Sequence, residues 1–400
     1  MKPIYLDNNA TTAVGPEVLE ETLPYLKDLY GNPSSMHTFG GQLGVKVREA
    51  RARVAALLGA EPEEIIFTSC GTESDNTAIM SALETYPQKR HIITTRVEHP
   101  AVYNFCKHLA RKGYRVSFVP VDGKGKLNMD AFLKALDDET AIVSIMYANN
   151  ETGVVFPIGE IGALLRERGI LFHTDAVQAV GKIPLDMKSL PVDMLSLSGH
   201  KLHAPKGVGA LYVRKGTRFY PYIIGGHQEH GRRAGTENVA SIIALGKACE
   251  LADEHINDEV TYVSRLRDKL ETALLRDCPN ARLNGDTEHR LPNTTNISFE
   301  YVEGEAILLR LDEFGICASS GSACTSGSLE PSHVLRAMGV PFTAMHGSIR
   351  FSLSRYNTEE EIDRVIEVLP PIIKDLRALS PYGREKLAAE KISQCISSGT

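Results

Sequence analysis

The sequence predicts an α/β fold, with a doubly wound, mostly parallel sheet and a smaller α/β second domain. Short apolar segments alternate with helical stretches between residues 65 and 213, which is typical of a parallel sheet. A long helical stretch at 239–276 has no partner in that alternation. We therefore expect a large domain at 15–258 and a small domain at 259–400, joined by an N-terminal segment, 1–14.

Apolar periodicity and turn residues define the individual elements. Helices are predicted at 16–29, 43–58, 73–84, 101–112, 129–136 and 158–168. Strands are predicted to end near residues 68, 94, 119, 145 and 173, followed by strands at 192–197 and 208–213. Segment 5–12 is polar after Leu6 and is expected to be a loop, and a helix is expected at 381–400.

Composition narrows the class of protein. With 400 residues, 42% hydrophobic residues and a formal net charge of −6, the chain is expected to fold around an ordinary globular core. The acidic balance does not favour nucleic acid or an anionic membrane as a partner. No apolar run reaches the roughly 18 residues of a membrane-spanning helix. The seven cysteines are scattered singly, which favours free thiols and the reducing cytoplasm.

Polar groups follow several of the predicted strands. In open α/β sheets, ligands bind beyond the carboxyl ends of the strands. The polar groups found there are Cys70 to Asp75, Glu98-His99, Asn149-Asn150-Glu151, Asp175-x-x-Gln178 and the turn that carries Lys201. Polar loops are common, but five on one edge of one sheet predict a binding site.

Three of these groups indicate a specific chemistry. Lys201 lies in a short turn between two apolar strands, where partial desolvation favours a neutral, nucleophilic amine. Gly71-Thr72 opens a helix whose free N–H groups can bind an anion, although Thr72 and Asp75 could also be a helix cap. Asp175 ends a buried strand, so it needs a cation or hydrogen-bond donors.

Two further residues come from the C-terminal part of the chain. Apolar and polar residues alternate over 348–354, which predicts a half-buried strand with Arg350 on its polar face. The planar guanidinium there could bind a carboxylate through two hydrogen bonds. Cys324 lies in a stretch rich in serine and glycine, 318–329, without apolar neighbours. This context favours an exposed, reactive thiol on a mobile segment over a structural cysteine.

Taken together, these motifs closely resemble the pyridoxal-phosphate-dependent cysteine desulfurases of the NifS type, the branch with a long cysteine-bearing loop. The resemblance covers about residues 1–375. It is carried by Tyr5-Leu-Asp-Asn-Asn-Ala-Thr-Thr12, Gly31-Asn-Pro-Ser-Ser35, Gly71-Thr-Glu-Ser-Asp-Asn76, Ala148-Asn-Asn-Glu-Thr-Gly153, Asp175-Ala-Val-Gln178, Ser198-Gly-His-Lys201, Arg233-Ala-Gly-Thr-Glu-Asn238 and Ser319-Ser-Gly-Ser-Ala-Cys324. The fold implied is that of the fold-type I, class V aminotransferase-like enzymes.

The resemblance implies a role for each site residue. Lys201 would hold pyridoxal 5'-phosphate as a Schiff base, Asp175 would pair with the pyridine nitrogen, and His99 would stack on the ring and shuttle protons. The other implied cofactor contacts are Asn150 and Gln178 at the ring hydroxyl, and Gly71, Thr72, Ser198, Gly199 and His200 around the phosphate. Thr236 would reach the phosphate from the other subunit of a homodimer.

The implied reaction uses Arg350 to hold the carboxylate of L-cysteine and Cys324 to attack its sulfur. Its products are L-alanine and a persulfide on Cys324, which passes to a scaffold protein that builds iron–sulfur clusters. The sequence departs from the family at Cys70, where a small Gly or Ala is usual, and at His230, where Arg is common.

Two other interpretations compete with this one. An aminotransferase or a selenocysteine lyase would share the Lys201 constellation, but transamination needs no thiol, so Cys324 favours the desulfurase. A non-enzymatic metal or sulfur carrier could use His200-x-x-His203 or His227-x-x-His230. Neither pair lies on an evident helix or has a cysteine pair beside it, so no metal site is expected.

Overall fold

The computed structural model describes residues 3–320 and 331–380. Its large sheet has seven strands in the order β2-β8-β7-β6-β5-β3-β4. These are β2 Ile65–Thr68, β3 His91–Thr95, β4 Arg115–Val119, β5 Thr140–Ser144, β6 Leu171–Asp175, β7 Met194–Ser198 and β8 Gly209–Val213. β8 is antiparallel to its neighbours β2 and β7, and the other described pairs of this sheet are parallel. The predicted mostly parallel sheet is therefore confirmed.

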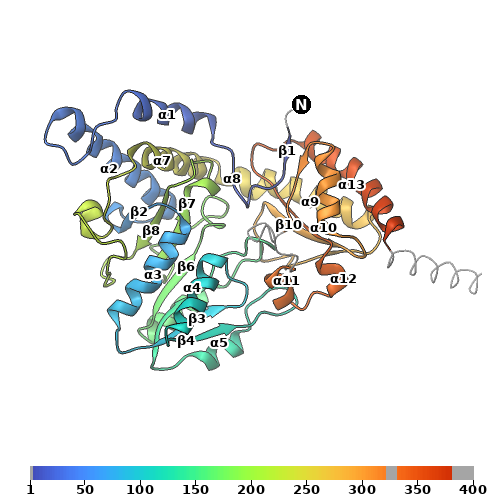
Figure 1. Ribbon diagram of the computed structural model, residues 1–400, viewed down its shortest axis with the longest axis horizontal. Coiled ribbons are helices and arrows are strands. Elements are labelled where there is room, and N and C mark those ends of the chain that lie inside the picture. The colour runs from blue at the N-terminus through green and yellow to red at the C-terminus, as the bar shows by residue number, and fades with distance from the viewer. Residues whose placement is uncertain (1–2, 321–330, 381–400) are drawn as a thin grey trace, which may run out of the picture.

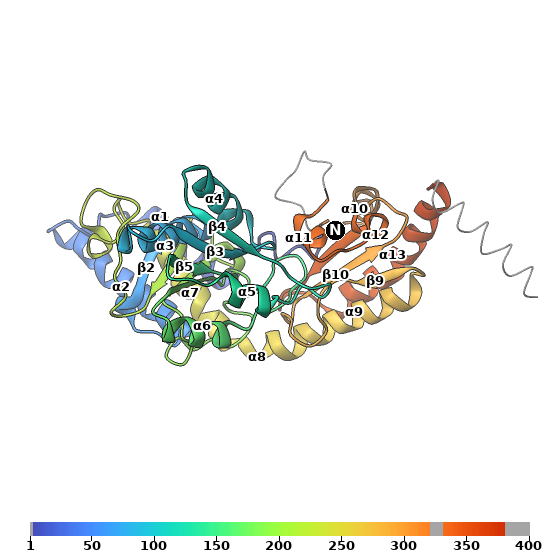
Figure 2. The ribbon, with the colours of Figure 1, turned by 90° about the horizontal axis from the view of Figure 1, so that it is seen from below.

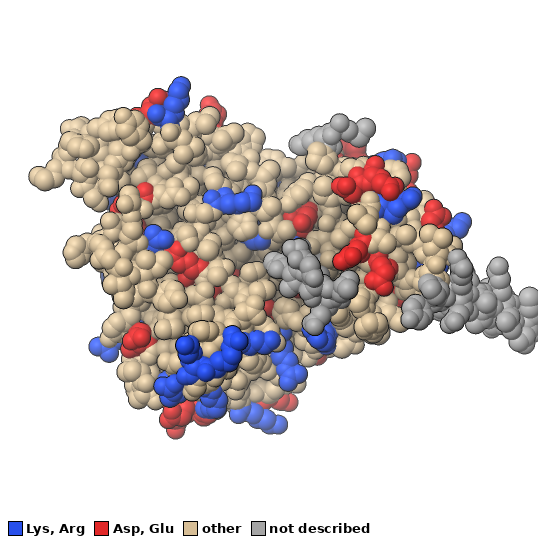
Figure 3. All heavy atoms as spheres, in the orientation of Figure 1, with Lys and Arg blue, Asp and Glu red and all other residues tan. Residues whose placement is uncertain are grey.

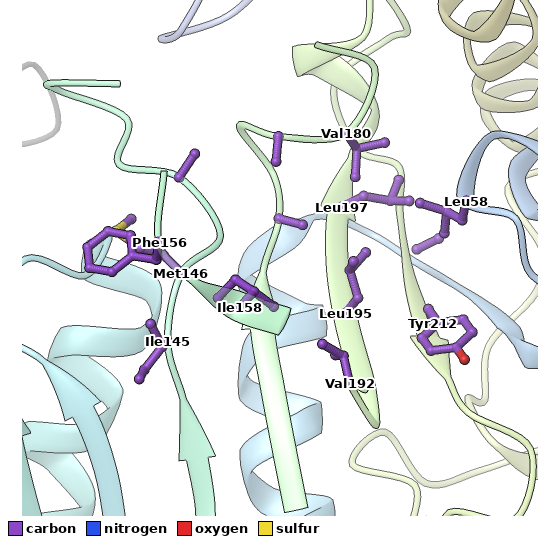
Figure 4. Packing of buried hydrophobic residues seen from close by; sticks show 14 of the residues in the cluster. Leu58, Ile145, Met146, Phe156, Ile158, Val180, Val192, Leu195, Leu197 and Tyr212 are labelled. Atoms are coloured by element: carbon purple, nitrogen blue, oxygen red, sulfur yellow. The ribbon is translucent and has the colours of Figure 1, made fainter. Parts of the chain in front are cut away.

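Helices cover both faces of this sheet (Figure 1). They are α1 Pro16–Lys27, α2 Thr38–Leu58, α3 Gly71–Thr85, α4 Pro100–Arg111, α5 Met129–Ala135, α6 Ile158–Glu167 and α7 Val239–Glu254, and the short helix η1 Pro62–Glu64 leads into β2. Side chains alternate along a strand, so Ile65 and Phe67 pack with α2 and α7 while Ile66 packs with α3 and α4. Figure 4 shows the first cluster, where Leu195 and Leu197 lie beside Leu58 and Tyr212. Burial on both faces is what a doubly wound fold requires.

The C-terminal part forms a smaller unit around the antiparallel sheet β12-β10-β9. Its elements are α8 Ile256–Asp258, the π-helical turn η4 Glu259–Val263, α9 Ser264–Asp277, β9 Ala281–Leu283, β10 Thr294–Phe299, α10 Gly304–Asp312, β11 Ile316–Cys317, α11 His333–Ala337, α12 Phe342–Met345, β12 Ser348–Ser352 and α13 Glu359–Leu379. Figure 2 shows α8 and α9 running from the large unit along the small one. The predicted helical stretch at 239–276 is present as α7, α8, η4 and α9, and we propose that it connects the two units.

The N-terminal segment returns to the small unit. Its predicted loop contains β1 Ile4–Tyr5, which pairs with β11, and Leu6 packs in the small apolar cluster. Conversely, Val334 and Leu335 of α11 pack in the large cluster. We propose that the domain division of 15–258 and 259–400 holds, with segment 1–14 and α11 packing across it.

Two local predictions were wrong. α2 begins at Thr38, before the predicted residue 43, because the His37 side chain accepts a hydrogen bond from Gly40 N and caps the helix. The strand at 348–354 is buried on both faces, not half-buried. Cys278 follows α9 and lies inside the small apolar cluster. The helix expected at 381–400 lies outside the described residues.

Charge is unevenly distributed over the surface. Lys107, Arg111, Lys112 and Arg115 are exposed on α4 and β4, and no acidic residue occurs between His99 and Val121. Figure 3 shows a band of basic side chains over the part of the molecule where Figure 1 draws these elements. The net charge of −6 therefore conceals a basic face. Within the described residues, no helix is long and apolar enough to cross a membrane.

Candidate active site

A cavity of about 330 Å³ lies at the carboxyl edge of the large sheet. It brings together most of the predicted site residues: Gly71, Thr72, His99, Asn150, Asp175, Gln178, Ser198, His200, Lys201 and Arg350. Asn9, Ala10, Asp75, Met146, Ala148 and Val177 also line it and were not predicted as site residues, and Cys70 lines it as well. These groups lie together because the carboxyl ends of β2, β3, β5, β6 and β7 are all at this edge of the sheet.

Lys201 ends the short helical turn η2 Gly199–Lys201 between β7 and β8. Its Nζ donates hydrogen bonds to the carbonyl oxygens of Asn9 and Ala10 at 2.5 and 2.7 Å. Gly199 does not line the cavity, but a Cβ there would lie 2.9 Å from Val208 Cγ1. Its role in this structure is therefore to let the turn pack closely, which places the amine of Lys201 in the cavity.

Asp175 is the last residue of β6 and is only 6% exposed. Its Oδ1 accepts a hydrogen bond from Val177 N at 3.0 Å. Burial raises the pKa of Asp175 to about 6, while that N–H and the positive charge of Lys201 oppose the rise. At neutral pH the carboxylate is therefore charged and can hold a proton on a ligand.

Asp75, on α3, is a second carboxyl at this cavity and is 1% exposed. Burial and then the neighbouring charge of Asp175 raise its pKa well above the usual range. Asp75 therefore carries the proton and Asp175 the charge, because two adjacent buried carboxylates are costly to ionise together. The sequence offers one signal for Asp75: it follows Gly71 by four residues and so lies on the same helix face.

His99 caps α4 and lines the cavity. Its Nδ1 accepts a hydrogen bond from Ala101 N at 3.2 Å, so the ring proton is on Nε2. Burial, followed by the charges of Lys201 and His333, lowers the pKa of His99 to about 4. The imidazole is therefore neutral at pH 7 and able to exchange a proton with a group in the cavity.

The N-terminus of α3 opens into the same cavity. Cys70 stands at its cap position, but no side chain caps the helix, so the predicted cap by Thr72 or Asp75 is wrong. A Cβ on Gly71 would lie 2.8 Å from Val177 Cγ2, so only glycine allows this approach of helix and loop. Uncapped N–H groups beside Ser198 and His200 form a site suited to an anion.

Arg350 reaches the cavity from β12 and is 2% exposed. Its Nη2 donates to Asp7 Oδ1 at 2.6 Å and its Nη1 to the carbonyl of Asn150 at 3.0 Å, while its Nε has no hydrogen-bond partner among the described residues. These contacts orient the guanidinium and leave a donor for an anionic group.

Of the predicted site residues that the structure describes, Gly199 and Thr236 do not line this cavity. Thr236 is exposed and does not line it, although the Arg233–Glu73 ion pair at 2.8 Å holds its segment beside the first turn of α3. Cys324 lies outside the described residues. Around the two histidine pairs, as elsewhere in the described chain, no three His, Cys, Asp or Glu side chains are placed to hold a metal ion.

The cavity fits the pyridoxal phosphate that the sequence resemblance implies. Lys201 offers an amine, Asp175 a carboxylate for the pyridine nitrogen, and the start of α3 a phosphate site. Gln178 Oε1 is buried without a hydrogen-bond partner in the described structure. Buried polar atoms are normally satisfied, so this residue of the cavity lining indicates that a polar ligand belongs here.

Comparisons with known proteins agree with this geometry. The model of the family "Aminotransferase class-V" matches residues 4–365. A curated cysteine desulfurase of Trichormus azollae is 66% identical over 386 residues, covering 96% of each chain. The cysteine desulfurase NifS of Azotobacter vinelandii is 60% identical over 383 residues, covering 96% of this chain and 95% of that one.

Solved structures give the same result. A NifS-like protein superposes with a TM-score of 0.88 at 41% identity, over 94% of this chain and 100% of that chain. The NifS-like protein from Rickettsia africae has a TM-score of 0.83 at 34% identity, over 93% and 99%. The chain therefore belongs to the class V aminotransferase family of pyridoxal-phosphate enzymes, in the group of cysteine desulfurases.

Proposed function

We propose that this chain is a pyridoxal-phosphate-dependent cysteine desulfurase. It converts L-cysteine to L-alanine and leaves the sulfur as a persulfide on Cys324, from which a scaffold protein for iron–sulfur clusters takes it. The observation that carries the proposal is one cavity containing Lys201, Asp175, His99 and Arg350 in a chain 60% identical to NifS. We further propose that it acts in the cytoplasm, where the free thiols of its described cysteines stay reduced.

Different side chains of the cavity bind the reactants and transfer protons. Bound pyridoxal phosphate supplies an electron sink that allows bonds near the substrate Cα to break. Asp175 holds the proton of the pyridine nitrogen, and Arg350 binds the substrate carboxylate. Neutral His99 carries its proton on Nε2. Lys201 has two carbonyl acceptors that can hold its amine when it is protonated.

Cys324 completes the reaction. Its thiolate attacks the sulfur of the bound cysteine; an S–S bond forms as the Cβ–S bond breaks, and the bonding electrons stay with the carbon. Proton transfer to that carbon yields alanine. One cysteine and one enzyme thiol thus give one alanine and one persulfide, with no external oxidant.

The function is tested by adding L-cysteine to the cofactor-loaded protein in the presence of a thiol reductant. We expect alanine and sulfide in equal amounts, because the reductant removes the sulfur from the persulfide after each turnover. Without the reductant, and at a low ratio of L-cysteine to enzyme so that the substrate thiol does not cleave the persulfide, alanine release should stop near one equivalent per active site. Transfer of the amino group to a keto acid without release of sulfide would identify an aminotransferase instead.

The proposed homodimer gives a separate prediction. Thr236 is exposed and does not line the cavity of its own chain, so in our proposal it serves the phosphate of the partner's cofactor. We expect sedimentation to give a dimer at micromolar concentration and Thr236→Val to weaken cofactor binding without changing the melting temperature. A monomer with full activity would contradict the proposal.

A further inference from the structure

The described residue before the Cys324 segment is attached to the wall of the cavity. Ser319 pairs with Arg350 through two backbone hydrogen bonds, Arg350 N to Ser319 O at 2.6 Å and Ser319 N to Arg350 O at 3.2 Å. Arg350 is the residue whose guanidinium lines the cavity. The upstream end of the segment is therefore fixed to the strand that supplies the proposed carboxylate-binding group.

Ser332, just after the segment, is fixed next to another cavity residue, Asn150. Ser332 caps α11 by accepting hydrogen bonds from Val334 N and Leu335 N, and its hydroxyl donates to Glu151 Oε2 at 2.5 Å. Glu151 is 5% exposed and directly follows Asn150, which lines the cavity. Burial raises the pKa of Glu151 to about 7, while the Ser332 hydroxyl and the charge of Arg350 favour its ionised form. The short contact matches a charge-assisted hydrogen bond.

A third contact supports the same end. His333 Nε2 donates to the carbonyl of Glu98 at 3.0 Å, and its ring lies 5.1 Å from that of Tyr103. Glu98 directly precedes His99. The downstream end is thus connected to the ends of both β3 and β5, the strands that lead to His99 and Asn150.

Chain length makes these anchors relevant to Cys324. Cys324 follows Ser319 by five residues and precedes Ser332 by eight. At no more than about 3.6 Å per residue, its Cα stays within about 18 Å of one anchor and about 29 Å of the other. Both anchors contact residues at or next to the cavity, so these chain lengths allow Cys324 to reach it. Releasing one anchor would let the segment sample more positions, which would lower the effective concentration of the thiol at the cavity.

We propose that Ser332 and Glu151 are positioning residues for sulfur transfer, because their hydrogen bond anchors the downstream end of the Cys324 segment beside the cavity. The proposal rests on the proposed role of Cys324. It assigns Ser332 and Glu151 to the sulfur-transfer step alone, since neither residue lines the cavity.

The test separates the two halves of the reaction by rapid mixing of the holoenzyme with L-cysteine. The cysteine-induced change in visible absorption reports substrate binding, and mass spectrometry of quenched samples reports the persulfide on Cys324. In Glu151→Ala and Ser332→Ala we expect the absorption change at the parental rate but persulfide formation about tenfold slower, equivalent to about 1.4 kcal/mol. Ser332→Thr and Glu151→Gln keep the donor and an acceptor, so both should stay within about twofold of the parent.

A matched control removes a helix cap away from the cavity. Asn128 caps α5 through its Oδ1, which accepts from Ala131 N at 2.9 Å; Asn128→Ala should lose comparable stability without slowing the persulfide. The proposal would be overturned if Glu151→Ala formed the persulfide at the parental rate, or if it slowed the absorption change as much as persulfide formation. It would also be overturned if Asn128→Ala slowed persulfide formation as much as Glu151→Ala does. A parental persulfide on a cysteine other than Cys324 would instead overturn the proposed function.

Discussion

Lys201→Ala is expected to purify without the visible absorption of a lysine-bound pyridoxal group and to have no measurable desulfurase activity. In the structure the Lys201 amine points to the carbonyls of Asn9 and Ala10 inside the cavity, and alanine leaves no nucleophile there. The loss of activity should reach several orders of magnitude, as for other nucleophiles that form a covalent intermediate. Absorption spectra of protein purified with added cofactor, together with alanine release, measure both effects.

The controls use two neighbouring lysines. Lys206 is exposed in the same turn, so Lys206→Ala should keep the absorption band and the activity. Lys182 is buried, and its Nζ lies 3.4 Å from the carbonyl oxygen of Lys201, which makes it the best alternative attachment site. Borohydride reduction followed by peptide mass spectrometry should locate the cofactor on Lys201. Label on Lys182 in the parent, or a yellow Lys201→Ala protein, would show that the assignment is wrong.

The sequence predicts the site well where it depends on the order of strands and helices. Asp175 ends β6, and Gly71 and His99 lie three and four residues after β2 and β3, and parallel strands bring their carboxyl ends to one edge. Asn9 and Ala10 were missed because segment 5–12 has no periodicity to place it. Their contact with Lys201 joins residues 192 and 191 positions apart, and local patterns carry no information about such pairings.

Arg350 shows a different limit. Alternation over 348–354 correctly predicts a strand and the face that carries Arg350. It does not show whether the polar face of that strand lies in solvent or packs against other polar groups. In the structure that face packs against other polar groups: Arg350 pairs with Asn296 on β10 and donates to Asp7. The polar face of β12 was predicted to be exposed, but it is covered by polar residues from distant parts of the chain and forms part of the cavity wall. The local sequence pattern does not contain this information.

Cys324→Ala is expected to abolish persulfide formation and to slow alanine release by on the order of a thousandfold or more, while the protein keeps its cofactor and still changes its absorption with L-cysteine. Four of the five described thiols make poor substitutes. Burial raises the pKa of Cys106 and Cys249 well above the usual range and that of Cys278 to about 12. Burial and nearby carboxylates also raise the pKa of Cys317. Thiolates, which are the nucleophilic form, are therefore disfavoured at these four positions.

Cys70 is the thiol that makes the control informative, because it lines the cavity beside Gly71. Cys70→Ala removes this thiol and should retain alanine release and the persulfide. Mass spectrometry of the parent after one turnover should find one added sulfur atom on the peptide that contains Cys324. The sulfur would be assigned to Cys70 if the added sulfur were found on the Cys70 peptide. The same would follow if Cys324→Ala released alanine at the parental rate and the Cys70→Ala/Cys324→Ala double variant did not. The cofactor assignment would be unaffected by that outcome, because it depends on Lys201 and Asp175 and not on either thiol.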